Sequence, residues 1–146
     1  MGNKEGSARF GRSLGCVLGG PMEIIIPGDT PTKKNSQRLV YAGGRPYLLP
    51  SAAYRRWEDG CAAYLPQVDE PISEPVHVRC LFYRRTRRAV DKLNLLEAVD
   101  DMLVHHGVLK DDNCRIVVHH DGSRVLYDKD NPRVEILIEP CDEPTL

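Results

Sequence analysis

The centre of the sequence is the stretch VDKLNLLEAVDDMLVHHGVLKDD, residues 90–112. Leu96, Val99 and Leu103 recur at three- and four-residue steps, which predicts an amphipathic helix from about residue 93 to residue 105. A carboxylate precedes this helix and a pair of carboxylates follows it. The stretch therefore predicts a helix that has acidic groups at both of its ends.

The segments around this helix predict a sheet and a second helix. Ser51 is a good N-cap for a helix over residues 52–65, whose recurring aromatic and cysteine side chains are most simply core. Alternating or β-branched runs predict a buried first strand at residues 24–26, a hairpin at residues 39–49, and further strands at residues 76–83, 116–118, 125–127 and 134–138. With 146 residues and 41% hydrophobic content, there is room for one core. We expect a single small α+β domain with a mixed β-sheet and two main helices.

The ends of the chain differ in composition from its middle. Residues 1–21 are rich in glycine and small side chains without periodicity, which predicts a disordered leader. Residues 22–140 are the expected folded domain, and residues 141–146 are an expected loose tail. Five cysteines without a C-x-x-C pair most simply indicate a reducing cytoplasm. No stretch approaches the ~20 apolar residues of a membrane span, so no membrane association is expected.

The charges of the chain are segregated although its net charge is only -1. That net charge excludes a uniformly basic nucleic-acid coat, but says nothing against local clusters. The basic and amide side chains suited to phosphate contact are Arg84, Arg85, Arg87, Arg88, Lys33, Lys34 and Asn35. Carboxylates hold a divalent cation, which must also reach the scissile phosphate. The pattern favours a metal-dependent, phosphate-cutting centre, and its alternative is a solvated helix beside a basic strand end.

The acidic residues at the two ends of the helix converge only under one condition. A helix of about a dozen residues spans roughly 20 Å. Asp91 therefore meets Asp112 only if residues 107–112 run back along the helix, and six extended residues at up to ~3.4 Å each could do so. Between the ends, Glu97 and Asp101 lie on one polar face of the helix.

Two other metal sites fit the sequence less well. Histidine pairs at residues 105–106 and 119–120 could suggest zinc, but neighbouring side chains in an extended segment point to opposite faces and no cysteine stands at ligand spacing. Residues 128–139 begin like a calcium-binding loop, yet Pro132 and Arg133 replace a needed ligand and a glycine.

The residues quoted so far resemble a known family, the RusA-type Holliday junction resolvases, small metal-dependent endonucleases often carried by phages and prophages. The resemblance rests on IIIPGDTPTKKNS, on SAAYRRW, and above all on D-x-x-N-L-L-x-A-V-x-D-x-L followed by G-V-x-x-D-D, and it runs from about residue 23 to residue 138. It implies a RusA-like fold, a homodimer, and a four-way DNA junction as substrate. It also implies Mg²⁺ as cofactor, with Mn²⁺ as an alternative.

The resemblance also implies residue roles, with two departures. The family's site has an aspartate, a second aspartate two residues later, a lysine one helical turn along, and the second aspartate of the D-D pair. Asp91 takes the first role and Asp112 the last, whereas Leu93 and Glu97 occupy the positions of the second aspartate and the lysine. Glu97 lies four residues after Leu93 on the same helix face and could supply the missing carboxylate. A two-residue insertion would instead make Asp91 the second aspartate, with Ala89 at the first position; we prefer the pairing without a gap.

The implied site can be stated residue by residue. Lys92 or Lys110 could supply the missing positive charge. The predicted catalytic residues are Asp91, Asp112, Glu97 and Lys92. The predicted metal ligands are Asp91, Asp112, Glu97 and Asp111, with Asp111 or Asp101 as supporting groups. The predicted DNA-binding residues are Lys33, Lys34, Asn35, Arg84, Arg85, Arg87, Arg88 and Lys110. The alternative function is a catalytically inactive protein that binds branched DNA.

Overall fold

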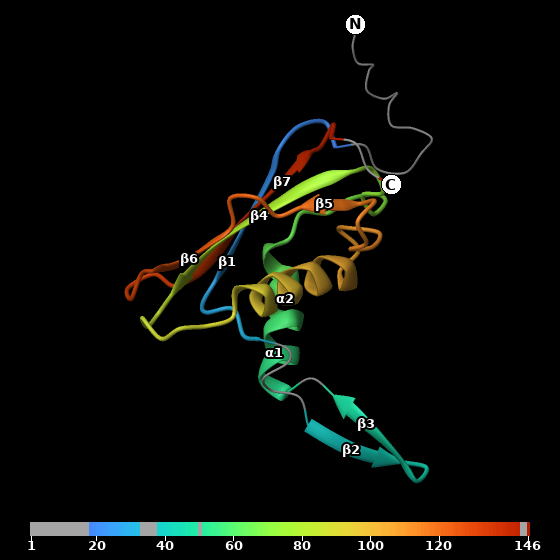
Figure 1. Ribbon diagram of the computed structural model, residues 1–146, viewed down its shortest axis with the longest axis vertical. Helices are drawn as coiled ribbons and strands as arrows, with labels where there is room; N and C mark the ends of the chain where they lie inside the picture. The colour runs from blue at the N-terminus through green and yellow to red at the C-terminus, as the bar shows by residue number, and fades with distance from the viewer. Residues whose placement is uncertain (1–17, 33–37, 50, 144–145) are drawn as a thin grey trace, which may run out of the picture.

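The computed structural model describes residues 18–32, 38–49, 51–143 and 146 (Figure 1). Most of the predicted leader lies outside these residues, as do Lys33, Lys34 and Asn35. Within the described part, no helix is long and apolar enough to cross a membrane.

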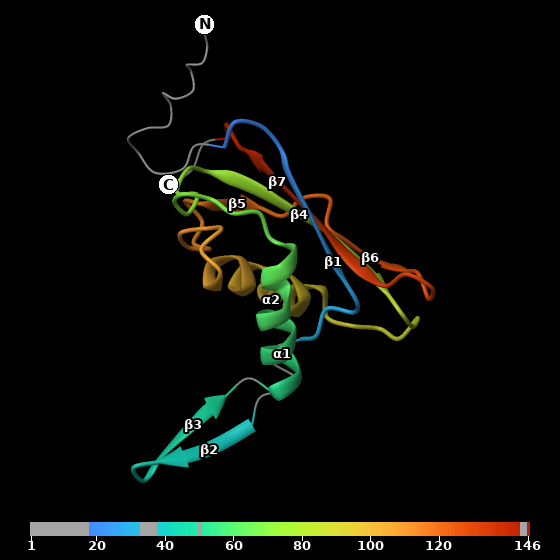
Figure 2. The same cartoon turned by 180° about the vertical axis from the view of Figure 1, so that it is seen from behind.

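The main sheet is mixed, as the sequence predicts. Its order is β1 (Met22–Pro27), β7 (Arg133–Pro140), β4 (Val76–Arg84) and β5 (Val117–His119), while β6 (Arg124–Tyr127) pairs with the far half of β4. β7 is antiparallel to both β1 and β4, whereas β5 and β6 are parallel to β4. β4 is therefore the central strand, bonded along both edges (Figures 1 and 2).

The central strand shows the predicted alternation. Val76, Val78, Cys80 and Phe82 are all at most 1% exposed, and the residues between them are half-buried. Period-two burial follows from the pleat, because successive side chains point to opposite faces of a sheet. One face of the sheet carries the hydrophobic core, and the other is polar and partly open to solvent.

The first strand differs from the expectation of a fully buried run. Ile24 and Ile26 are buried in the core, but Ile25 is 54% exposed. β1 has only its inner face covered, so every second side chain points outward. A run of three isoleucines does not reveal this difference, since all three side chains are equally apolar.

Two helices supply the other layer of the core. α2 (Lys92–His105) buries Leu95, Leu96, Val99, Met102 and Leu103 against the inner face of the sheet, as its periodicity predicts. α1 (Ala52–Cys61) lies beside it (Figure 2). The single α+β domain with two main helices is confirmed.

The second helix is shorter than predicted. The side chain of Ser51 accepts the N–H of Tyr54 at 3.0 Å, which confirms the N-cap. α1 ends at Cys61 and continues as a 3₁₀ helix, η3 (Ala62–Tyr64). A 3₁₀ helix turns through a larger angle per residue than an α-helix. The apolar side chains after Cys61 therefore no longer point in the direction of those in α1. Tyr64, expected in the core, is consequently 51% exposed.

The predicted hairpin is present and stands apart from the main sheet. Among the residues that the structure describes, β2 (Arg38–Ala42) and β3 (Arg45–Leu49) pair only with each other (Figure 1). Gly43 and Gly44 have φ angles of 59° and 78°. Positive φ at both central residues is what a two-residue turn of the I′ type requires. The hairpin also exposes the apolar side chains of Leu39, Tyr41, Tyr47 and Leu48.

Candidate metal and nucleic-acid site

The first predicted ligand caps a helix. Asp91 has an extended backbone at the N-terminus of α2, and its Oδ1 accepts the N–H of Leu93 at 3.0 Å. This bond satisfies one of the unpaired amides at the start of the helix. Asp91, Lys92 and Leu93 are all exposed, and Leu93 is 69% exposed although its side chain is apolar. Asp91 therefore has a structural role besides any chemical one.

The D-D pair is positioned by the chain that leaves α2. Gly107, with a φ of 75°, ends the helix. Val108 and Leu109 are then buried, and both of their N–H groups donate to the carbonyl of Leu103. Leu109 also forms an isolated parallel bridge with Ile72. These contacts fix the start of the turn that carries Asp111 and Asp112 at the C-terminal end of α2.

Acidic side chains gather where this turn meets α2. We call Glu97, Asp100, Asp101, Asp111 and Asp112 the acidic cluster. Partial burial of its carboxyl group, followed by the charges of Asp100, Asp101 and Asp111, raises the pKa of Asp112 above its usual value. A pocket beside the cluster is lined by Tyr54, Glu58, Asp101, Val104, His105, Asp111 and Asp112. α1 thus contributes Tyr54 and Glu58 to the surroundings of Asp112, which sequence spacing could not reveal.

Asp111, the first aspartate of the pair, stabilises the turn through hydrogen bonds. Oδ1 of Asp111 accepts the N–H of Asp112, and Oδ2 accepts the side-chain amide of Asn113, each at 2.8 Å. These hydrogen bonds lower the pKa of Asp111. The opposite pKa shifts of the two neighbours separate their roles, because Asp111 is satisfied within the turn whereas Asp112 faces other carboxylates.

The most buried acid of the cluster had no role assigned from the sequence. Asp100 is 7% exposed, and Nε2 of His120 lies 3.1 and 2.9 Å from its two carboxylate oxygens. Burial raises the pKa of Asp100, and the hydrogen bond and charge of His120 oppose that rise. The available signal was its position, because Asp100 lies next to the apolar stripe instead of on the outer polar face.

The predicted ligands are brought together only in part. Asp112 lies near Asp100 and Asp101, whereas Asp91 precedes Asp101 by ten residues, about 15 Å along a helix. Among the described residues, Asp91, Glu97, Asp111 and Asp112 supply no group of three ligand atoms within 4.8 Å of one another. The expected return of the chain to Asp91 is not seen, because Val108 and Leu109 anchor the turn in the core at the other end of the helix.

The four predicted arginines have different surroundings. Arg84 is half-buried, and its guanidinium donates to the carbonyl of Thr30. The backbone N–H of Arg85 donates to Asp29 at 2.8 Å. The guanidinium of Arg87 lies 4.0 Å from the ring centre of Tyr127. Arg85, Arg87 and Arg88 are exposed, as is Lys110 beside the D-D pair. Arg84 therefore anchors the loop after β1, whereas the side chains of the other three arginines are exposed, with the guanidinium of Arg85 4.0 Å from the carboxylate of Asp29.

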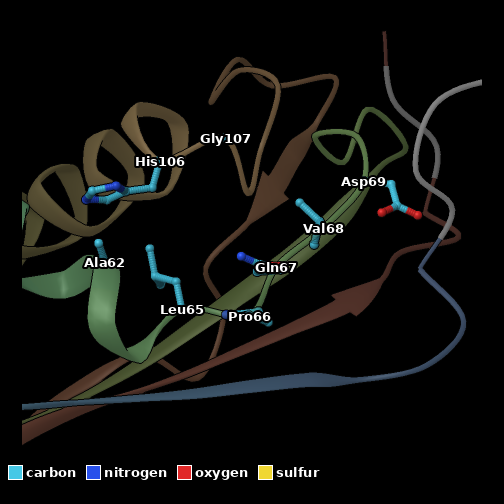
Figure 3. A pocket seen from close by; sticks show the side chains of 8 residues that line it. All are labelled: Ala62, Leu65, Pro66, Gln67, Val68, Asp69, His106 and Gly107. Carbon is cyan, nitrogen blue, oxygen red and sulfur yellow. The ribbon is translucent and has the colours of Figure 1, made fainter.

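A second hollow lies between the end of α2 and the chain that follows α1 (Figure 3). It is lined by Ala62, Leu65, Pro66, Gln67, Val68, Asp69, His106 and Gly107. The Nε2 atom of His106 lies 2.7 Å from the backbone carbonyl of Glu58, a contact that ties α2 to α1. This histidine therefore has a structural partner, and the predicted site residues lie elsewhere.

The partial burial of Asp112, together with the charges of the acids around it, predicts a measurable effect on stability. Its pKa is higher in the folded than in the unfolded chain, so the folded state binds more protons between the two pKa values, and stability falls as pH rises through that window. We expect Asp112→Asn to raise the midpoint of thermal unfolding at pH 7 and to leave it unchanged below about pH 4. Thermal melts across pH measure this difference. A lower midpoint at pH 7 would show that the Asp112 charge is stabilising.

The donor chemistry of the acidic cluster fits a hard divalent cation. Mg²⁺ prefers oxygen ligands and commonly takes one or two protein carboxylates. Partial burial is the main cause of the raised pKa of Asp112, and the charges of Asp100, Asp101 and Asp111 add to it. A bound cation would offset both effects, since it favours the charged carboxylate.

Comparison with known proteins adds one finding. The model of the family described as endodeoxyribonuclease RusA matches residues 28–139. The match begins in the turn after β1 and ends one residue before the end of β7. It includes both helices, the arginine segment and the acidic cluster. A comparison with curated proteins finds no match.

Proposed function

The chain belongs to the endodeoxyribonuclease RusA family, and from that membership we propose that it cuts Holliday junctions or related branched DNA by metal-dependent phosphodiester hydrolysis. The observation that carries the proposal is the extent of the match, which covers the acidic cluster and the arginine segment together. The family is one of nucleases that resolve Holliday junctions and generally use a divalent metal. The choice of Mg²⁺, with Mn²⁺ as an alternative, is part of the proposal.

Asp112 is the ligand that sequence and geometry both support. The resemblance gives it the role of the last family aspartate, and its surroundings crowd carboxylates around it. We assign Asp101 beside it, and retain Asp91, Glu97 and Asp111 as the other proposed ligands. When bound, Mg²⁺ supplies charge relief at the phosphate and an activated water. The protein's own part is to place the carboxylates of Asp101 and Asp112 near each other at the end of α2.

The exposed basic residues would bind the DNA backbone. Arg85, Arg87 and Arg88 follow β4 directly and lead into the N-terminus of α2. A helix N-terminus also favours a phosphate, since its free N–H groups carry partial positive charge. We assign Lys92 and Lys110 to the same phosphate path, along with Lys33, Lys34 and Asn35 from the loop outside the described residues.

The proposal includes the assembly and setting of the protein. A four-way junction has two equivalent strands to cut, and a symmetric dimer offers two equivalent sites. We therefore propose a homodimer acting in the cytoplasm, with residues 22–140 as the folded unit.

The test is cleavage of a synthetic four-way junction by the purified full chain. We expect paired nicks in opposing strands with 5′-phosphate ends in Mg²⁺, and none in excess EDTA. A linear duplex of the same sequence is the control and should remain uncut. Junction binding, measured in EDTA so that no cleavage occurs, should weaken steeply with added salt, because the contacts between protein and phosphates release counterions. Uncut junctions in both Mg²⁺ and Mn²⁺, with binding preserved, would refute the nuclease proposal.

The exposure of Leu93 favours one alternative, a binding protein without catalysis. A leucine that is 69% exposed stands where the family has an aspartate, so one ligand is absent from that position. A protein that holds the junction but does not cut it would retain the arginine segment and lose only the acid.

Leu93→Asp tests this alternative by restoring the acid. The site is solvent-exposed and in the first helical turn, where a negative charge is favoured by the helix dipole, so the fold should tolerate the change. We expect junction cleavage to rise by about tenfold or more, in line with the effect of groups that tune a metal site. Leu93→Asn is the matched control, because asparagine has nearly the size of aspartate but no charge. Equal rates for the two variants would argue against a ligand at this position.

A further inference from the structure

We propose that His119, Cys141 and Glu143 form a binding site for a zinc-class transition metal ion, separate from the acidic cluster. One ligand atom from each residue lies within 4.8 Å of the other two, and these three form the one such group among the described residues. They also line a hollow with His77, Pro140 and Asp142. Neither the family resemblance nor the proposed nuclease chemistry uses any of these residues.

Strand pairing explains why these residues meet. His77 on β4 lies opposite Glu139 on β7 and opposite His119 on β5. Residues directly opposite each other share a face of the sheet, and Cys141 follows Glu139 by two positions, so it continues on that face. The N–H of Cys141 donates to the carbonyl of Pro75 at 3.1 Å, which holds the chain against β4 beyond the end of β7.

The site lies on the other side of the sheet from the acidic cluster. His120 points inward and contacts Asp100 on α2, whereas His119 stacks on His77 with 4.6 Å between ring centres. Neighbouring histidines thus point in opposite directions, as the sequence predicts. No cysteine stands at ligand spacing in the sequence, but the chain that follows β7 brings Cys141 close to His119 in the fold.

The ligand atoms of these three residues favour Zn²⁺ over Mg²⁺. Nitrogen, thiolate sulfur and carboxylate oxygen are the ligands of Zn²⁺, and a soft thiolate selects against Mg²⁺. Two ligand atoms ~2.1 Å from a tetrahedral ion lie about 3.4 Å apart. Nε2 of His119 is 3.4 Å from Oε2 of Glu143, so this pair already has that separation. Three protein ligands leave the fourth position to water.

Groups around His119 are placed to support metal binding. Nδ1 of His119 accepts the backbone N–H of Asp121 at 3.2 Å and also lies 3.6 Å from the Asp121 carboxylate. Ligation through Nε2 therefore requires the ring proton to move to Nδ1, where this carboxylate is the acceptor within reach. The stacked ring of His77 limits rotation of His119, and His77 is itself paired with Glu139 at 3.4 Å.

The decisive experiment is a cobalt titration of the purified full chain after removal of metal with a chelator. Co²⁺ is a spectroscopic substitute for zinc, and a cysteine ligand produces a thiolate-to-cobalt charge-transfer band in the near ultraviolet. We expect this band to saturate at one Co²⁺ per chain and to be removed by Zn²⁺ but not by Mg²⁺. A wild-type chain without the band, or one whose Co²⁺ binds without thiolate absorption, would overturn the proposal.

Matched variants locate the site. Cys141→Ser and His119→Ala should lose the band, while Cys114→Ser, which removes an exposed cysteine elsewhere, should keep it. Asp121→Asn should weaken metal affinity roughly tenfold. Asp112→Asn should leave the band unchanged, which separates this site from the proposed nuclease centre. Circular dichroism of Cys141→Ser checks that the fold is intact, and a band that persists in the folded variant would refute the assignment.

Discussion

Asp112→Asn is expected to lower the rate of junction cleavage by about 100-fold or more. Removal of a supporting group around a metal already costs about 10–100-fold, so loss of a proposed direct ligand should cost at least the upper value. The substitution keeps the side-chain size and relieves charge crowding, so folding and junction binding should persist. Single-turnover cleavage, with binding measured in parallel by gel shift, tests both halves of the expectation.

Two further variants define what a loss at Asp112 means. Asp142→Asn removes an acid that lines the hollow beside His119, so its cleavage rate should equal that of the wild type. Asp91→Asn keeps a good N-cap and removes only the charge. A loss in both Asp91→Asn and Asp112→Asn would mean that the two acids act on one phosphate in the DNA complex. Unchanged cleavage in Asp112→Asn would remove the acidic cluster from the mechanism.

Phe82→Ala is expected to lower the free energy of unfolding by about 3–5 kcal/mol. Phe82 is 1% exposed and lies on β4, between the sheet and the helices. Its removal leaves a cavity that neighbours on two sides of the central strand cannot readily fill, because β4 is bonded to β7 and β6 there. Urea unfolding followed by circular dichroism measures the loss.

A conservative change at the same position provides the control. Phe82→Leu retains most of the apolar volume and should cost clearly less than Phe82→Ala. A loss below about 1 kcal/mol for Phe82→Ala, typical of an exposed position, would contradict the packing of this core layer.

Local patterns predicted the elements that have one buried face. α2 and β4 follow directly from periodicities of 3.6 and 2, because burial of one side leaves a readable stripe in the sequence. The same reasoning placed the hairpin turn at a glycine pair, since positive φ angles restrict the residue type there. It failed at Ile25 and Tyr64, where an apolar residue faces solvent.

Long-range contacts could not be predicted from these patterns. The local sequence does not indicate that β5 and β6 both pair with β4. It also does not indicate that Val108 and Leu109 anchor the turn after α2 at the end of that helix. The sequence offered Asp112 as a candidate ligand and the family resemblance gave it a role, but only the fold brings Asp100 and Asp101 close to it.

The β2–β3 hairpin also has a thermodynamic consequence for recognition. A ribbon of two strands is marginally stable in water. In the described part of the chain, the only strand partner of β2 is β3, and the reverse is also true. Among the described residues, the ribbon therefore gains no stabilising strand contact from the main sheet. A molecule that contacts the exposed Tyr41 and Leu48 would bind one conformation from that ensemble, and its apparent affinity would be reduced by the fraction of chains in which the ribbon is unformed.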